Sequence, residues 1–305
     1  MSRRARHALL IGAGSLLWLS SAPASSPPDL VSIHVAVDGP IVGSGGALTA
    51  DEFVVSIDGR PTTIASLTPP PAPLTIVLLL DKTTSMETYG EIDEDVAKSL
   101  VPALQPGDRA RIGGIAGRLA LAPAFSSNPR EILAAGRAAV AFRKEDRAGP
   151  SPIWDAMDRA LDAIDPEPGV RAIVLVSDGR GTGNRTSVAA VGDRAISAGV
   201  IVDVLSEALP VVLRQSETTA ARVRPGLALE EMARATGGLI VPSDPTPSTV
   251  LPPAGSTLVR FVNDLRGMYT IAVPAEGPPG SVHRIDVKIN RPGLTARTRR
   301  AYRTR

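Results

Sequence analysis

The chain has 305 residues and a formal net charge of only +2, so its overall charge indicates neither nucleic acid nor a membrane surface as a partner. Hydrophobic residues make up 43% of the sequence and aromatic residues only 3%, which predicts a core of Val, Leu, Ile and Ala. The length allows one α/β domain and a smaller second unit. The sequence contains no cysteine, which excludes disulfides and thiol chemistry.

The first 24 residues have the pattern of an export signal. Three arginines within the first six residues precede an apolar run from Ala8 to Leu19, which is short for a membrane span. Residues 22–24, Ala-Pro-Ala, fit a small-x-small cleavage site. We therefore expect export to the periplasm or the medium, by the general or the twin-arginine route. No second run of 18 apolar residues follows, so we expect no membrane span in the mature chain.

Short alternating segments over residues 31–67 predict an N-terminal β segment. Residues 31–37 and 53–57 read as strands, and Asp58-Gly59 is typical of a tight hairpin turn. We expect the return strand of that hairpin over residues 62–67. Residues 68–73 are rich in proline, which neither a helix nor a central strand tolerates, and therefore predict a linker.

Strands and helices alternate over residues 74–242, the predicted domain core. This alternation predicts a mainly parallel sheet with helices on both faces, a Rossmann-like α/β fold. The predicted strands are residues 76–80, 110–115, 119–125, 172–176, 200–205 and 239–241. The predicted helices are residues 92–104, 129–142, 152–164, 186–198 and 227–236.

Residues 254–303 are predicted to form a further helix and a second β segment. The helix covers residues 257–265, a strand covers 268–273, and a hairpin joins 283–289 to 294–300. A lone hairpin is marginally stable in water, so we expect the two β segments to form one small β unit. Residues 284–305 contain eight basic residues and one acid, with Tyr302 as their aromatic residue. We expect a solvated strand face and a frayed tail there, and no nucleic-acid binding.

Oxygen-bearing side chains follow two of the all-apolar strands. The strand over residues 76–80 is followed by Asp81, with Thr83 and Ser85 at alternate positions after it. The strand over residues 172–176 is followed by Asp178. Between the two, Ser151 directly precedes a predicted helix. Open α/β sheets bind ligands at the carboxyl ends of their strands, and hard divalent cations prefer oxygen ligands. Each residue alone has an ordinary explanation as a turn former or a helix cap. The combination of five oxygens indicates a metal site.

The sequences DKTTS, GPSPIWDA and VLVSDG, which contain these residues, resemble the three metal-binding loops of the von Willebrand factor A domain. The resemblance implies a metal-ion-dependent adhesion site for Mg²⁺, or for Mn²⁺ or Ca²⁺. It implies as metal ligands Asp81, Thr83, Ser85, Ser151 and Asp178. The family usually has Ser where this chain has Thr83 and Thr where it has Ser151, and each replacement keeps a hydroxyl. The order of segments over residues 31–303 is also similar to that of secreted A-domain-related proteins found in Acidobacteria.

Two classes of function are compatible with such a site. The first is a non-enzymatic adhesion module, in which a partner protein supplies a carboxylate to the ion. The second is a magnesium-dependent phosphoryl-transfer or hydrolytic enzyme, because an Asp at a strand end also describes aspartyl phosphatases. Those enzymes resemble Asp-x-Asp, whereas residue 83 here is Thr. The sequence has no GxxxxGK phosphate loop, and its three histidines support neither a Ser-His-Asp arrangement nor a zinc site. We therefore expect a binding protein and not an enzyme.

Overall fold

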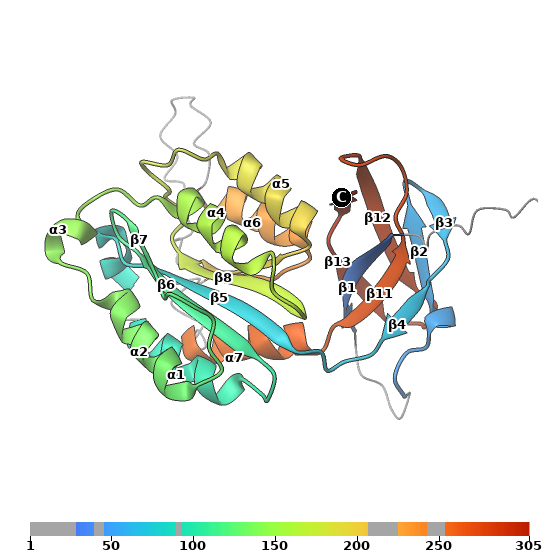
Figure 1. Cartoon of the computed structure of the whole chain (residues 1–305), viewed down its shortest axis with the longest axis horizontal. Coiled ribbons are helices and arrows are strands. Elements are labelled where there is room, and N and C mark those ends of the chain that lie inside the picture. The colour runs from blue at the N-terminus through green and yellow to red at the C-terminus, as the bar shows by residue number, and fades with distance from the viewer. Residues whose placement is uncertain (1–28, 40–45, 90–92, 207–224, 243–253, 305) are drawn as a thin grey trace, which may run out of the picture.

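The computed structural model describes residues 29–39, 46–89, 93–206, 225–242 and 254–304. It consists of two lobes side by side, an α/β lobe and a sandwich of two antiparallel sheets (Figure 1). The predicted export signal, residues 1–24, lies outside the described residues. Within the described ranges, no helix combines the length and the apolar character needed to cross a bilayer.

A six-stranded sheet in the order β10-β9-β8-β5-β6-β7 forms the centre of the α/β lobe. Neighbouring strands are parallel except β6 and β7, an antiparallel hairpin at one edge. The strands are β5 (Leu74–Asp81), β6 (Arg109–Ile115), β7 (Leu119–Leu121), β8 (Val170–Ser177), β9 (Ile201–Ser206) and β10 (Ile240–Pro242). The predicted α/β fold class is confirmed. β7 is shorter than predicted because the chain leaves the sheet after Leu121 and meets β6 again at an isolated bridge between Ala110 and Ser126.

Helices cover both faces of this sheet (Figure 1). Helices α1, α2 and α7 pack on one face and α4, α5 and α6 on the other. Their bounds, with those of the short α3, are α1 (Asp93–Ala103), α2 (Pro129–Val140), α3 (Lys144–Arg147), α4 (Ile153–Ile164), α5 (Val188–Ala198), α6 (Pro225–Thr236) and α7 (Ala254–Arg266). All eight residues of β5 are buried, because its side chains alternate between two apolar clusters: Leu78 belongs to one and Leu79 to the other. This two-sided packing fixes the position of the loop that follows β5.

The second lobe consists of the sheets β13-β1-β11-β4 and β14-β12-β2-β3. The N-terminal strand β1 pairs with β11, and the N-terminal strand β2 pairs with β12. The predicted pairing of the two terminal β segments is therefore confirmed. The strands are β1 (Leu30–Asp38), β2 (Phe53–Ile57), β3 (Arg60–Thr62), β4 (Ser66–Thr68), β11 (Tyr269–Pro274), β12 (Val282–Ile289), β13 (Thr295–Thr298) and β14 (Ala301–Arg303).

Two predictions of strand pairing are wrong. The predicted C-terminal hairpin does not form: β12 pairs with β2 and β14, whereas β13 pairs with β1 in the opposite sheet. The predicted return strand over residues 62–67 divides into β3 and β4, which also lie in different sheets. A sandwich needs strands that change sheets, and the choice of sheet depends on the other strands rather than on local alternation. The predicted Asp58-Gly59 turn is present, with positive φ of 51° and 80°.

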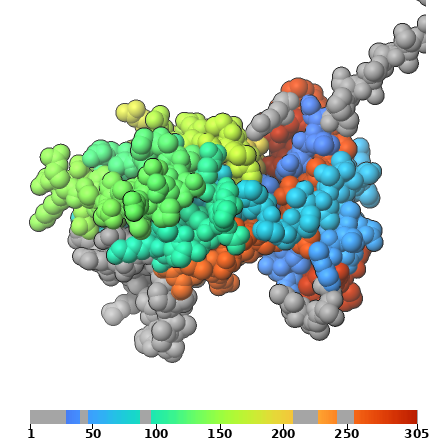
Figure 2. Space-filling model, turned by 60° about the horizontal axis from the view of Figure 1, so that its bottom comes forward, coloured from blue at the N-terminus to red at the C-terminus, as the bar shows by residue number. Residues whose placement is uncertain are grey.

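The basic C-terminal residues include contacts between the lobes, so the prediction of a solvated face is wrong for Arg297 and Arg299. Arg297 forms an ion pair with Asp264 of α7, with 2.6 Å between Nη2 and Oδ1. Arg299 donates to the carbonyls of Ile196 in α5, at 2.9 Å, and Ser32 in β1, at 2.8 Å. Figure 2 shows the two lobes meeting at a narrower contact zone. These arginines connect the sandwich to the helices of the α/β lobe.

Candidate metal centre

The predicted ligands lie at the carboxyl edge of the parallel sheet. The neighbouring strands β5 and β8 end at Asp81 and Ser177, and Asp178 follows directly. Thr83 and Ser85 lie in the turn after β5, and Ser151 lies just before α4. Hydrogen bonds join the first four predicted ligands, Asp81, Thr83, Ser85 and Ser151, into one chain.

Asp81 accepts hydrogen bonds at both carboxylate oxygens. Its Oδ1 accepts from the backbone N–H of Thr83, at 3.1 Å, and from the Thr83 hydroxyl, at 2.7 Å. Its Oδ2 accepts from Ser151 Oγ, at 3.1 Å, and from Ser177 Oγ, at 2.8 Å. Thr83 Oγ1 lies 3.2 Å from Ser85 Oγ. Burial raises the pKa of Asp81, and the hydrogen bonds from Thr83, Ser177 and Ser151 oppose that rise.

The first loop is held by its own sequence and by the core. Asp81 is short enough to bond the backbone two residues later, which makes the tight turn that Asp favours. The backbone N–H of Lys82 donates to the carbonyl of Ile115 at the end of β6, at 2.8 Å. Met86 is buried in the apolar cluster beneath, and its N–H donates to the Thr83 carbonyl, at 2.9 Å. The hydroxyls of the loop therefore project from a turn fixed on both sides.

Ser151 is positioned by the third loop rather than by its helix. Helix α4 begins at Ile153 with Pro152 as the N-cap residue, so the Ser151 hydroxyl does not cap α4 and instead donates to Asp81. The Ser151 N–H donates to Thr182 Oγ1, at 2.9 Å, and the Thr182 N–H donates to the Ser151 carbonyl, at 2.8 Å. Gly183 has φ of +70°, and a Cβ there would lie 2.7 Å from Pro150 Cβ. Glycine therefore permits the close approach of the two loops.

Asp178 carries the unsatisfied atom of the site. Its Oδ1 accepts from the backbone N–H of Arg180, at 2.9 Å. Its Oδ2 is buried and has no hydrogen-bond partner, although Nε of the largely exposed Arg180 side chain lies 3.7 Å away. A buried carboxylate oxygen without a partner is costly to the folded state. A bound cation would satisfy this oxygen, so the geometry around Asp178 is suited to a positively charged ligand.

Three residues that organise the site were not predicted: Ser177, Thr182 and Asn184. Asn184 Oδ1 accepts from the N–H groups of Trp154, at 2.8 Å, and Asp155, at 3.3 Å, and so caps α4 from another loop. Ser177 has a signal in the sequence, a polar residue closing an apolar strand. Thr182 and Asn184 have none, because their partners lie about 30 residues away and only the fold brings them close.

The donor set is one of hydroxyls and two carboxylates. No group of three or more His, Cys, Asp or Glu side chains is arranged to bind a metal among the residues that the structure describes. A hydroxyl that donates its proton to a carboxylate keeps two lone pairs for a cation. Thr83 and Ser151 are in this state, and Asp178 offers its unpaired oxygen. The residues present therefore fit a hard divalent ion.

The scan of protein-family models and the search of curated proteins both give no match to this chain.

Several solved structures are similar to this chain. An aerotolerance-related membrane protein from Bacteroides fragilis is 18% identical over 63% of this chain and 98% of its own, with a TM-score of 0.48. A von Willebrand factor type A structure from Catenulispora acidiphila is 12% identical over 91% of this chain and 74% of its own, with a TM-score of 0.48. Proximal thread matrix protein 1 from the mussel byssus, with a zinc-occupied MIDAS motif, is 15% identical over 68% of this chain and 50% of its own, with a TM-score of 0.49. One of the three is a von Willebrand factor type A structure, and the loop sequences of this chain resemble that family.

Proposed function

We propose that this protein is an exported, non-enzymatic binding module that engages a partner protein through a divalent ion at the carboxyl edge of its sheet. One observation carries the proposal. Oδ2 of Asp178 is buried without a hydrogen-bond partner, and the preceding residue, Ser177, donates to Asp81 in the hydroxyl chain that runs from Ser85 through Thr83 and Asp81 to Ser151. Buried polar atoms without a hydrogen bond are uncommon, and a cation at this oxygen would compensate for the missing one.

The residues divide into ion-binding and positioning roles. The hydroxyls of Thr83, Ser85 and Ser151 would contact the ion. Asp81 accepts hydrogen bonds from the hydroxyls of Thr83 and Ser151 and so fixes the direction of their lone pairs. Asp178 would supply negative charge through Oδ2, directly or through water. When bound, the ion would supply an electrophilic centre for an external carboxylate. Neutral hydroxyl ligands favour that role because they add no charge to the site.

The composition of the site argues against the enzyme alternative. Thr83 occupies the place where an aspartyl phosphatase has its second acid, and its hydroxyl donates to Asp81. Asp81 and Asp178 are the carboxylates among the described side chains of the site, and neither has a second acid beside it as a proton donor. We expect no turnover of a generic phosphate ester with Mg²⁺. Magnesium-dependent turnover that is lost in Asp81→Asn would replace this proposal with the enzyme.

Isothermal titration of two matched variants tests the ion site. Thr83→Val removes a buried hydroxyl that bonds Asp81, and Thr84→Val makes the same change at the exposed neighbouring position. The wild type and Thr84→Val should bind one divalent ion among Mg²⁺, Mn²⁺, Ca²⁺ and Zn²⁺. Thr83→Val should bind it about tenfold more weakly, or worse, because one ligand is lost. Absence of binding in the wild type, or equal affinity in both variants, would refute the site.

Engagement of a partner is tested by affinity capture from the periplasmic or secreted fraction. The protein should retain a partner in Mg²⁺ and release it when a chelator is added. Asp178→Asn should retain none under either condition, because the charge that holds the ion is gone. A partner retained equally with chelator would show that binding does not pass through the ion.

A further inference from the structure

A cavity lies between the two lobes. It consists of two adjoining hollows of about 540 and 440 Å³, which share Ser197, Ala198, Arg303 and Thr304. Ser197 and Ala198 end helix α5 of the α/β lobe, and Arg303 belongs to strand β14 of the sandwich. We call this space the interlobe cleft. Its size is that of a site for a small molecule.

Three arginines converge on the larger hollow. Arg171 comes from the start of β8, Arg299 from the turn between β13 and β14, and Arg303 from β14. Asp29 is the carboxylate residue of the same lining, and Arg171 is ion-paired with Asp165 of the smaller hollow, with 3.1 Å between Nη1 and Oδ1. Arg299 and Arg303 donate to neutral acceptors. The larger hollow of the interlobe cleft therefore has an excess of positive charge, from Arg299 and Arg303 against Asp29.

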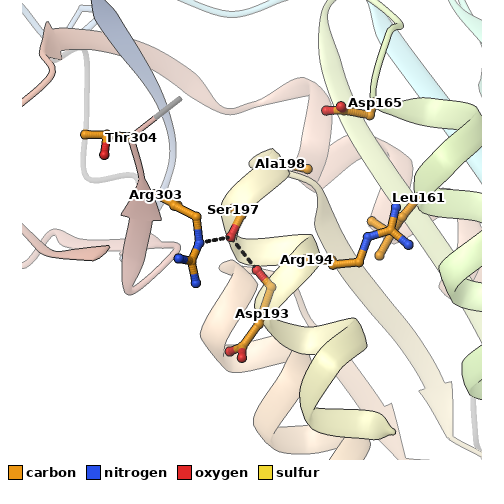
Figure 3. A pocket seen from close by; sticks show the side chains of 8 residues that line it. All are labelled: Leu161, Asp165, Asp193, Arg194, Ser197, Ala198, Arg303 and Thr304. Carbon is orange, nitrogen blue, oxygen red and sulfur yellow. Dashed lines mark hydrogen bonds between the residues drawn. The ribbon is translucent and has the colours of Figure 1, made fainter. Parts of the chain in front are cut away.

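The contacts of Arg303 orient its guanidinium without neutralising its charge. It donates to the carbonyl of Gly280, at 2.8 Å, and to the hydroxyl of Ser197, at 3.4 Å. Figure 3 shows the side chain reaching from the sandwich to Ser197 at the end of α5. Both acceptors are neutral, and the residue is exposed to solvent in the cleft. Arg303 is thus held in place with charge available for an anion.

His34 reports the positive charge of these arginines inside the interlobe cleft. It lines the larger hollow, and its Nδ1 lies 3.1 Å from the hydroxyl of Thr270. Its pKa is lowered to about 4, first by burial and then by the charges of Arg299 and Arg171. A neutral histidine beside three arginines leaves the net charge of the lining positive at neutral pH.

We infer that the interlobe cleft binds a small polyanion, a molecule with several phosphate or carboxylate groups. Arginine forks match both groups in bidentate geometry. Arg171 donates to Asp165, and Arg299 donates to two backbone carbonyls. Arg303 would therefore be the main anchor of the anion, and Arg299 would add positive charge. The site is separate from the metal centre. Arg171 is the second residue of the strand that Asp178 follows, and the seven residue steps from one to the other span about 23 Å along the sheet. The inference can therefore be tested independently of the proposed function.

Calorimetry on the full chain, freed of metal with EDTA, tests the inference with two probes. Inorganic pyrophosphate represents phosphate ligands and citrate represents carboxylates, with sodium chloride at equal ionic strength as the reference. At least one probe should bind, and the stronger one identifies the class of anion. Arg303→Gln should weaken binding about tenfold, because a charged hydrogen-bond donor is lost. The matched variant Arg284→Gln, at an exposed position on β12 outside the cleft lining, should stay within about twofold.

The ring protons of His34 give a readout at the site itself. By NMR, a bound polyanion should raise the titration midpoint of His34, since it offsets the charges of Arg299 and Arg171. Failure of both probes to bind would overturn the inference. So would binding that Arg303→Gln leaves unchanged, or binding that leaves the His34 midpoint in place.

Discussion

Ser177 donates a hydrogen bond of 2.8 Å from its Oγ to Oδ2 of Asp81, and so joins the ends of two strands that are 96 residues apart in the chain. Oγ of Ser177 in turn accepts a hydrogen bond from the N–H of Gly179, at 3.0 Å. Ser177 is fully buried. One hydroxyl therefore fixes both the carboxylate of the first loop and the backbone of the third loop.

Ser177→Ala should lower the free energy of unfolding by about 1–3 kcal/mol, because it leaves a buried carboxylate oxygen and a buried N–H each short of a partner. Urea unfolding measures the change. Ser66→Ala, at an exposed position in β4, is the control and should change stability by less than about 0.5 kcal/mol. Equal stability of the two variants would show that the Ser177 contact contributes nothing.

Arg180→Gln should tighten binding of the divalent ion. Nε of Arg180 lies 3.7 Å from the unpaired Oδ2 of Asp178, so its positive charge competes with a cation there. The side chain is 60% exposed, and solvent therefore limits the gain to about 1 kcal/mol, or fivefold in affinity. Titration calorimetry with Mg²⁺ measures it, with Arg185→Gln in the same loop as the control. Weaker binding in Arg180→Gln would show that Arg180 supports the ion instead.

Asp203 is a buried acid outside the metal centre and gives a pH-dependent prediction. Its Oδ1 accepts from the N–H of Leu239, at 2.7 Å, and its Oδ2 has no hydrogen-bond partner. Burial raises its pKa to about 7; Asp264 raises it further, while the Leu239 hydrogen bond and Arg297 lower it. In the unfolded chain the residue has an ordinary pKa near 3.8. Between these two values the folded state binds the extra proton.

The difference between the folded and unfolded pKa of Asp203 determines how its contribution to stability changes with pH. The contribution of Asp203 is complete at low pH and is lost as pH rises from about 4 to about 7. Asp203→Asn should therefore gain stability relative to the wild type across this range, by up to about 4 kcal/mol above pH 7. Urea unfolding at pH 5 and pH 8 measures it. A difference between the two proteins that does not change with pH would contradict the prediction.

Arg297→Met should destabilise the protein by about 3–5 kcal/mol, because it removes the cation that Asp264 and Asp203 face. Arg300→Met makes the same change at an exposed neighbouring position and should cost less than about 1 kcal/mol. Denaturant unfolding compares the two. Adding Asp203→Asn to Arg297→Met should restore part of the lost free energy of unfolding. If the free-energy changes of the two substitutions simply add in the double variant, Asp203 and Arg297 do not interact.

The sheet and the order of the site residues could be predicted because both are local patterns. β5 and β8 are apolar at every position, which marks them as central strands, and Asp81 and Asp178 follow them directly. Helical spacing of apolar residues likewise located α4, whose start lies beside Ser151. These features depend on neighbours within one element and are therefore visible in the sequence.

The remaining features depend on contacts between distant segments. β13 pairs with β1 rather than with its neighbour β12, a choice made by the sandwich as a whole. Arg299 looked like a surface residue because its acceptors, the carbonyls of Ile196 and Ser32, come from backbone that only the fold presents. The unpaired oxygen of Asp178 is likewise a property of the assembled site and has no signature in the sequence.

Thermal unfolding of the wild type and Asp178→Asn, each with EDTA and with excess Mg²⁺, tests the central claim most directly. Asn keeps the size of the side chain and the acceptor for the Arg180 N–H but removes the charge of the unpaired oxygen. In EDTA the variant should unfold at the same temperature as the wild type or higher, because the lost charge was buried without a hydrogen bond at Oδ2 and its ion pair with the largely exposed Arg180 contributes little. In Mg²⁺ the wild type should gain stability, by about 2.7 kcal/mol at a hundredfold excess over Kd, and the variant should gain none. A variant that unfolds early in EDTA yet gains as much from Mg²⁺ as the wild type would show that Asp178 is structural and that the ion binds elsewhere.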